Sequence, residues 1–148
     1  MSITQKRLEK ELLNIEKNII PGIIINKPDD IMTWHATIAG PSDSPYMNGI
    51  FKIRFRFNYE YPVKPPIVDF LTPMYHPNIY RDGKICVDIL QSEWSPVQNV
   101  RTILISIISL LTDPNPNSPA NRDAAMLYTK SKEEYNIKVR KFIEENNL

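Results

Sequence analysis

Apolar and basic side chains alternate strictly in the stretch Phe51-Lys52-Ile53-Arg54-Phe55-Arg56-Phe57. Successive side chains of a β-strand point to opposite faces of a sheet, so a period of two indicates one buried and one solvated face. The dipeptide Asn48-Gly49, just before the stretch, is a tight-turn signal. We therefore expect a strand of an antiparallel sheet here, with its apolar face toward the core.

Three more strands are expected on either side of this one. They cover residues 23–25, 33–38 and 67–71, and in the second of them Trp34, Ala36 and Ile38 share one face. Four consecutive strands joined by short connections favour an antiparallel meander with one face covered by helix.

Helical spacing of apolar residues begins the chain and returns in its second half. The first helix is expected to end at Pro21-Gly22. Its apolar residues recur every three or four positions, at Leu8, Leu12, Ile15 and Ile19. A second helix is expected from about Gln98 to Asp113-Pro114. It is apolar nearly all round, which is typical of a central, buried helix.

Two capping signals place the last helices. Asn121 is expected to cap a short helix that runs through Tyr128. The run Ser131-Lys132-Glu133-Glu134 is a capping box that opens the final helix. The inner face of the final helix is expected to consist of Tyr135, Val139, Phe142 and Ile143.

Between the last strand and the second helix, from Thr72 to Pro96, no periodicity survives. A compact domain rarely tolerates about 25 irregular residues unless they are functional. The order is a helix, four strands, an irregular segment and three helices, which predicts an α+β fold. A length of 148 residues is that of one domain, so residues 1–148 are expected to form a single unit.

Charge and hydropathy exclude several classes of function. Eighteen basic and 17 acidic residues leave a formal net charge of +1, so the chain has no global electrostatic reason to bind nucleic acid or an anionic membrane. No apolar run approaches the roughly 20 residues that cross a bilayer. Residues 1–13 lack the apolar region of a signal peptide. One unpaired cysteine suits a reducing compartment, so the cytoplasm, the nucleus or both are expected.

The only cysteine, Cys86, lies inside the irregular segment. It cannot form an internal disulfide, so it is either a small core residue or a nucleophile. Free cysteines are usually buried. Here, however, the neighbouring Gly83 and Lys84 favour an accessible thiol. Such a thiol suits exchange between thioesters, which needs nucleophilicity and a clear approach more than a dedicated base.

Two other uses of the thiol are disfavoured. One cysteine and two histidines, His35 and His76, do not supply a tetrahedral metal site, and no short-spaced ligand pair exists, so no metal is expected. A cysteine protease needs a histidine base beside its thiol. His76 is followed by Pro77, so the chain is expected to be extended there and the His76 ring to be held in place by its neighbours. His35 lies on a strand, on the face opposite to that of Trp34. Neither arrangement favours a catalytic triad.

Five motifs in order give the chain a specific resemblance. They are Gly40-Pro41-Ser42-Asp43-Ser44-Pro45-Tyr46, Tyr61-Pro62-Val63-Lys64-Pro65-Pro66, His76-Pro77-Asn78, Gly83-Lys84-Ile85-Cys86-Val87-Asp88-Ile89-Leu90 and Trp94-Ser95-Pro96. Over nearly its whole length the chain resembles the ubiquitin-conjugating enzymes. The resemblance implies that it accepts ubiquitin as a thioester from an activating enzyme. It then passes the ubiquitin to lysines of substrate proteins with a ligase.

The same resemblance implies no cofactor, because the activating enzyme consumes the ATP. Two alternatives are a conjugating enzyme for a ubiquitin-like modifier and a non-catalytic scaffold of the same fold. Scaffold variants lack the cysteine, so Cys86 argues against the second alternative.

The resemblance also implies roles for single residues near the thiol. Cys86 matches the thioester-forming cysteine. Asn78 matches an asparagine that either stabilises the oxyanion as lysine attacks or holds the active-site loop. Asp88 matches a carboxylate that positions or deprotonates the lysine, the alternative being a helix-capping aspartate. His76 and Pro77 are interpreted as structural.

A gate beside the active site is expected at Ser118 and Asn115. Many family members carry Asp where this chain has Ser118, and phosphorylation there would restore about −1.5 to −2 charges. The segment 115–121 resembles the DNA-repair and histone-monoubiquitylating branch of the family, whereas the short loop 26–31 resembles the protein-turnover branch. We favour the first branch.

Interfaces with partner proteins are implied at two places. The family presents two loops to ligases, RING-type ligases among them, at positions matched by Val63, Pro96 and Val97. The activating enzyme is expected to meet the first helix at Lys6, Arg7 and Lys10. A monomer is expected. The basic face of strand 51–57 either binds a second ubiquitin or is an ordinary solvated surface.

Overall fold

A computed structural model describes all 148 residues of the chain. The elements, in order, are α1 (Ile3–Lys17), β1 (Ile23–Ile25), β2 (Thr33–Ala39), β3 (Ile50–Arg56), β4 (Ile67–Phe70), the 3₁₀ helix η1 (Asp88–Leu90), α2 (Val100–Thr112), α3 (Arg122–Lys130) and α4 (Lys132–Glu145). The four strands form one antiparallel sheet in the order β1-β2-β3-β4. The predicted α+β fold with a four-stranded meander is therefore confirmed.

Strand β3 has the two faces that its sequence predicts. Phe51, Ile53 and Phe55 are fully buried, whereas Lys52 and Arg56 are exposed. A register slip of one residue would turn the buried set toward solvent, so the hydrophobic pattern itself fixes the pairing with β2. Each of the predicted strand boundaries lies within one residue of the observed one.

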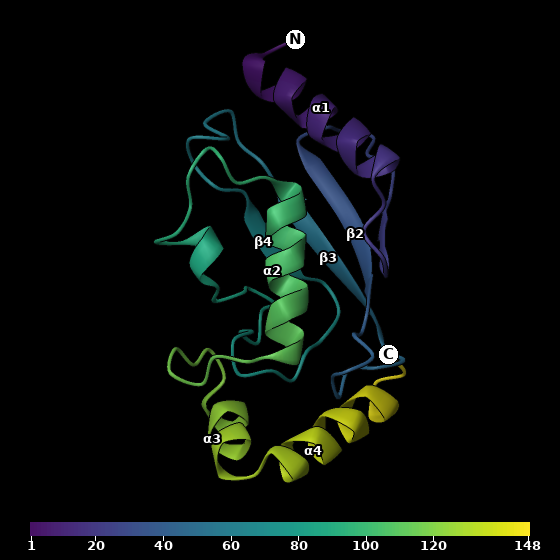
Figure 1. Cartoon of the computed structure of the whole chain (residues 1–148), viewed down its shortest axis with the longest axis vertical. Helices are drawn as coiled ribbons and strands as arrows, with labels where there is room; N and C mark the ends of the chain where they lie inside the picture. Colours follow the sequence, from purple (N-terminus) through teal and green to yellow (C-terminus); the bar gives the residue numbers. More distant parts are fainter.

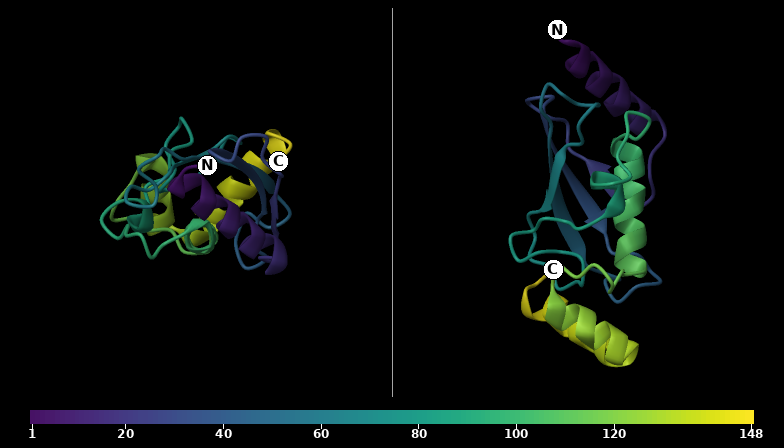
Figure 2. Two further views of the ribbon diagram at one scale, coloured as in Figure 1. Left: turned by 90° about the horizontal axis from the view of Figure 1, so that it is seen from above. Right: turned by 90° about the vertical axis from the view of Figure 1, so that its left-hand side faces the viewer.

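The helices cover one face and both ends of the sheet. Helix α2 packs across the apolar face, α1 lies at one end, and α3 and α4 lie together at the other end (Figure 1). Seen from the side, α2 and the sheet form two layers, and no helix covers the opposite face of the sheet (Figure 2). None of the helices is long and apolar enough to cross a membrane.

Helix α2 supplies five buried residues to the core, at Val100, Ile103, Leu104, Ile107 and Leu111. The prediction of a central helix is confirmed, but the expectation that α2 is buried nearly all round is wrong. The side chain of Ile105 is half exposed, and Ser109 is exposed as well. This open face of α2 becomes one wall of the candidate site.

Three helix boundaries differ from the predicted ones, and capping residues account for the first two. Helix α1 ends at Lys17, where Asn18 caps it, so Ile19 lies outside the helix and is 76% exposed. Helix α2 begins at Val100, because Asn99 accepts the N–H of the third helical residue. Helix α3 extends two residues beyond Tyr128.

Only half of the predicted capping box forms at the start of α4. The Ser131 hydroxyl accepts the Glu134 N–H at 3.2 Å. The Ser131 N–H, which the Glu134 side chain would bond in a full box, instead donates to the Leu127 carbonyl and closes α3. One residue thus ends one helix and begins the next. Tyr135 and Val139 form the buried face of α4, while Phe142 and Ile143 are only partly buried.

Candidate active site

A short hairpin places the thiol at the edge of the sheet. The Ile79 and Ile85 positions form an antiparallel bridge, and the Phe70 N–H donates to the Gly83 carbonyl at 2.8 Å. Gly83 has φ +93° at the tip, and a Cβ there would lie 2.0 Å from the Phe70 carbonyl oxygen, so only glycine fits. The hairpin ends at Cys86, whose N–H donates to the Asn78 carbonyl at 2.8 Å.

The amide of Asn78 is fully buried and all its polar groups are engaged. Its nitrogen donates to the carbonyls of Asn115 at 2.7 Å and Ser118 at 3.0 Å. Its oxygen accepts the Asn115 N–H at 2.8 Å. The side chain therefore holds the 115–118 loop against the segment that leads to Cys86. To donate to an oxyanion, Asn78 would have to give up one of these bonds.

The two residues before Asn78 anchor two helices. The buried His76 ring accepts the Asn78 N–H at Nδ1, 2.9 Å away, and its Nε2 lies 2.8 Å from the Leu110 carbonyl at the end of α2. The Pro77 carbonyl accepts the N–H groups of Ala120 and Asn121, just before α3. Burial lowers the pKa of His76 to about 4, so the ring is neutral near pH 7. It has no free nitrogen to act as a base for the thiol.

Cys86, Asp88, Asn115 and Ser118 line one hollow of about 610 Å³. Cys86 is half-buried and lies outside the hydrophobic core, in contrast to the interpretation of the thiol as a core residue. The other three side chains are exposed. Asp88 opens η1, but Val87 is the N-cap residue and the Asp88 carboxylate makes no capping bond.

One wall of this hollow was not expected from the sequence. It is the open face of α2, with Ile105, Ser106 and Ser109. The only sequence signal is the pair of serines, three residues apart, which interrupts the apolar pattern on a single face.

The loops that carry the proposed ligase contacts are joined to each other. The Trp94 indole N–H donates to the Pro62 carbonyl at 3.0 Å, which brings the two loops together. Val63 and Val97 remain 72% and 82% exposed, and Pro96 is also exposed. The structure therefore presents the three apolar side chains on neighbouring, tied loops.

The three basic residues of α1 that were expected to meet the activating enzyme, Lys6, Arg7 and Lys10, differ in their surroundings. Lys6 and Lys10 are exposed. Arg7, in contrast, donates to Glu11 at 3.0 Å and to the Gln98 carbonyl at 2.8 Å. Because the bond to Gln98 ties α1 to the segment just before α2, Arg7 also has a structural role that its sequence context does not reveal.

Glu11 is a further structural residue that the sequence did not single out. One carboxylate oxygen accepts the Tyr61 hydroxyl at 2.6 Å, and the other accepts the Val100 N–H at 2.8 Å. Burial and the neighbouring carboxylate raise the pKa of Tyr61, which keeps the hydroxyl protonated as the donor. Glu11 thus joins α1, the loop after β3 and the first turn of α2.

The arrangement is that of a thiol carrier. A lone accessible thiol lies on a rigid hairpin without a histidine base, and no group of three His, Cys, Asp or Glu residues is placed to hold a metal ion. A carrier thiol needs open approach for an incoming and an outgoing acyl group, and the hollow provides it.

Comparisons with known proteins identify the family. The family model described as ubiquitin-conjugating enzyme matches residues 7–143. Ubiquitin-conjugating enzyme E2 3 of Arabidopsis thaliana is 49% identical over 143 residues, which are 96% of this chain and 95% of the plant protein. Ubiquitin-conjugating enzyme E2 1 of Caenorhabditis elegans is 44% identical over 146 residues, 98% of this chain and 76% of the nematode protein. Ubiquitin-conjugating enzyme E2 2 of Saccharomyces cerevisiae is 44% identical over 143 residues, 96% of this chain and 83% of the yeast protein.

The chain belongs to the ubiquitin-conjugating enzyme family. It is a transferase that works through a cysteine thioester, with ubiquitin, an activating enzyme and ligases as its partners.

Proposed function

We propose that Cys86 is the residue that carries ubiquitin. The observation that supports this most directly is that the family works through a cysteine thioester and that this chain has one cysteine, which lines an open hollow. The Cys86 sulfur attacks the thioester carbonyl at the ubiquitin C-terminus. A new C–S bond forms while the bond to the activating enzyme breaks, and the thiol of that enzyme leaves.

In the second transfer, a substrate amine attacks the Cys86 thioester. A C–N bond forms, the C–S bond breaks, and Cys86 leaves as a thiolate, which regains a proton to restore the thiol. The exposed Asp88 carboxylate lines the same hollow and is proposed to position the amine and take up its proton. Asn78 is proposed to keep the 115–118 loop in place, and a donor role toward the oxyanion requires release of one loop carbonyl.

We further propose that Ser118 and Asn115 form the gate of this hollow. Ser118 is exposed, so a kinase has access to its hydroxyl. A phosphate there would add about −1.5 to −2 charges beside the attacking amine, where many family members carry a carboxylate.

The exposed Val63, Pro96 and Val97 are proposed to bind a ligase of the RING type, and Lys6 and Lys10, with Arg7, to bind the activating enzyme. The chain is proposed to act as a single catalytic domain over residues 1–148, as a monomer in the cytoplasm, the nucleus or both. Ubiquitin is favoured over other modifiers because the relatives' names specify it. Membership of the repair and histone branch is proposed on segment 115–121.

A charging assay tests the assignment of Cys86. The protein is incubated with ubiquitin, activating enzyme and ATP, and adducts are separated on gels with and without thiol. We expect a thiol-labile adduct for the wild type, a thiol-resistant ester for Cys86→Ser and no adduct for Cys86→Ala. An adduct that persists in Cys86→Ala would contradict the assignment, and charging only with another modifier would select the modifier alternative.

A further inference from the structure

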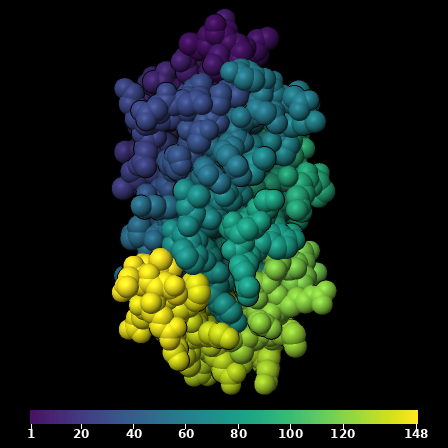
Figure 3. All heavy atoms as spheres, turned by 180° about the vertical axis from the view of Figure 1, so that it is seen from behind, coloured from purple at the N-terminus to yellow at the C-terminus, as the bar shows by residue number.

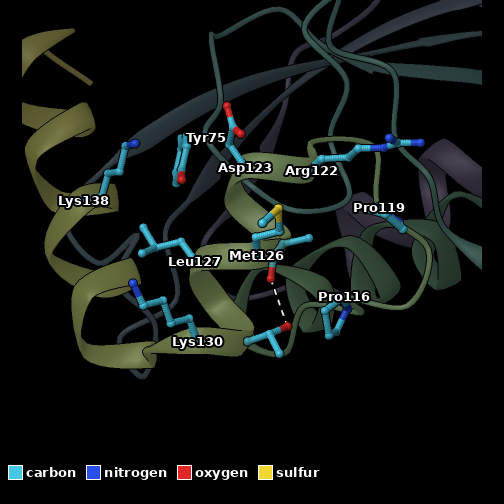
Figure 4. Close-up of a pocket in the computed structure, with 11 residues that line it drawn as sticks. Tyr75, Pro116, Pro119, Arg122, Asp123, Met126, Leu127, Lys130 and Lys138 are labelled. Atoms are coloured by element: carbon cyan, nitrogen blue, oxygen red, sulfur yellow. Dashed lines mark hydrogen bonds between the residues drawn. The ribbon is translucent and has the colours of Figure 1, made fainter.

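A second and larger hollow crosses the outer face of α3, away from Cys86. It encloses about 890 Å³, compared with about 610 Å³ for the hollow at Cys86. The loop containing Pro116 and Pro119 lies on one side of it, and Tyr75 and Lys138 lie on the other (Figure 4). We call this hollow the α3 groove. From behind, the segment around residue 75 is seen to reach down between α4 and α3 (Figure 3).

The floor of the α3 groove is apolar. Met126 is 71% exposed, although it is a large hydrophobic residue on a regular helix. Methionine side chains adapt to varied partners, and clustered exposed apolar residues mark interaction surfaces. The Tyr75 hydroxyl, which points toward Leu127, is buried without a hydrogen-bond partner. A peptide group that displaces Leu127 would supply the missing partner.

The rim of the α3 groove is basic. Arg122, Lys130 and Lys138 line it with a single carboxylate, Asp123. None of these three cations belongs to an ion pair in the structure. The Lys138 ammonium lies 5.1 Å from the centre of the Tyr75 ring. Unpaired cations around an apolar floor are complementary to a peptide that combines acidic and apolar side chains.

The α3 groove and the hollow at Cys86 lie on two sides of the same loop. Asn115 and Ser118 line that hollow, and Pro116 and Pro119 of the same loop line the groove. The loop between the two hollows is fixed in place by the Asn78 amide, and α3 is tied to the Pro77 carbonyl. A chain with a lysine at Cys86 can therefore pass over a rigid loop directly into the groove.

We propose that the α3 groove binds the segment of the acceptor protein next to its target lysine and selects segments with an apolar residue among acidic ones. This proposal rests on the function of Cys86 proposed above. The apolar residue lies against Met126 and Tyr75, and the acidic residues pair with Lys130, Lys138 and Arg122. A bound flank raises the local concentration of the lysine at the thioester and so accelerates transfer.

The test is a single-turnover discharge assay without a ligase. Enzyme charged with ubiquitin is separated from ATP and mixed with one of three acceptors: free lysine, an acetylated peptide with one lysine and a leucine among Asp and Glu, or the same peptide with Asn and Gln. The variants are Lys130→Glu combined with Lys138→Glu, and Met126→Ser. The matched control is Lys141→Glu, an exposed lysine of α4 that does not line the groove.

We expect the wild type and Lys141→Glu to discharge about fivefold to tenfold faster to the acidic peptide than to the neutral one, as a few partly screened ion pairs allow. The double charge reversal should abolish this preference, and Met126→Ser should slow both peptides equally. Free lysine lacks a flank, so its rate should be equal in all proteins.

Three results would overturn the proposal. They are an equal rate for both peptides in the wild type, an unchanged preference in the double variant, and a defect of the double variant that appears only with a ligase, which would assign the groove to the ligase. Charging is measured first and shows that each variant is folded. Absence of any thiol-labile adduct on Cys86 would instead contradict the function on which the proposal rests.

Discussion

Replacement of Asn78 by alanine tests whether this residue holds the active-site loop. The buried amide makes three hydrogen bonds, two to the carbonyls of Asn115 and Ser118 and one from the Asn115 N–H. An intramolecular hydrogen bond contributes about 0.5–1.5 kcal/mol net, so we expect Asn78→Ala to lower the free energy of unfolding by about 3 kcal/mol. For a domain of this size, that loss lowers the melting temperature by about 6–12 °C.

Thermal unfolding and two rates measure the effect together. If the loop loses its support, both charging of Cys86 and discharge to lysine should slow. A residue that acts only as an oxyanion donor would leave the melting temperature unchanged and slow discharge alone, by about 10²–10³. The matched control is Asn117→Ala, because the Asn117 side chain is exposed and makes no hydrogen bond. A melting temperature for Asn78→Ala within about 2 °C of the wild type would refute the reasoning.

Three further outcomes are expected. Trp94→Phe removes the indole bond to the Pro62 carbonyl. It should therefore reduce ligase-stimulated discharge while the ligase-free rate stays unchanged, and equal loss of both rates would contradict the role of Trp94 in the ligase loops. His76 has a folded pKa of about 4, below its unfolded value of about 6.5, so the unfolded state binds more protons in this range. Stability from this group is therefore complete above about pH 6.5 and falls by about 3 kcal/mol as the pH drops to about 4. Denaturant unfolding at several pH values should show this slope, and it should be absent in His76→Gln. For Ser118, discharge should be faster in Ser118→Asp than in Ser118→Ala, and equal rates would remove the phosphorylation hypothesis.

Local patterns were sufficient for most of the fold. The strand at 51–57 could be predicted because apolar and basic residues alternate, so each residue type indicates whether its side chain is buried or exposed. The core helix could be predicted because its apolar residues outnumber its polar ones. The end of α1 could not be predicted in this way. Ile19 continues the helical period in sequence, but the chain turns at Asn18, whose carbonyl is bonded by Arg101 from α2. That partner is 83 residues away, beyond the reach of any local pattern.

The candidate site shows the same division. Cys86 and the motif around Asn78 stand out in the sequence, and the resemblance to a family assigns them roles. The bonds of the Asn78 amide could not be predicted, because its partners lie 37 and 40 residues downstream. The exposed side of Ile105 was missed for another reason: its exposure depends on the hollow beside α2, which forms only when η1 and the 115–118 loop pack around it. The α3 groove likewise combines residues from four separate segments.

The Asn78 amide bonds only to backbone atoms of the 115–118 loop. These bonds therefore do not depend on which side chain stands at position 118, whereas the Asn115 side chain itself supports the loop by accepting the Asn117 N–H at 3.1 Å. A serine, an aspartate or a phosphoserine at Ser118 can occupy the same backbone position, so the charge beside the thioester can change during evolution or signalling without remodelling the loop. The buried Asn78 amide fixes the backbone of the loop, while the residue at position 118 sets the charge beside the thioester.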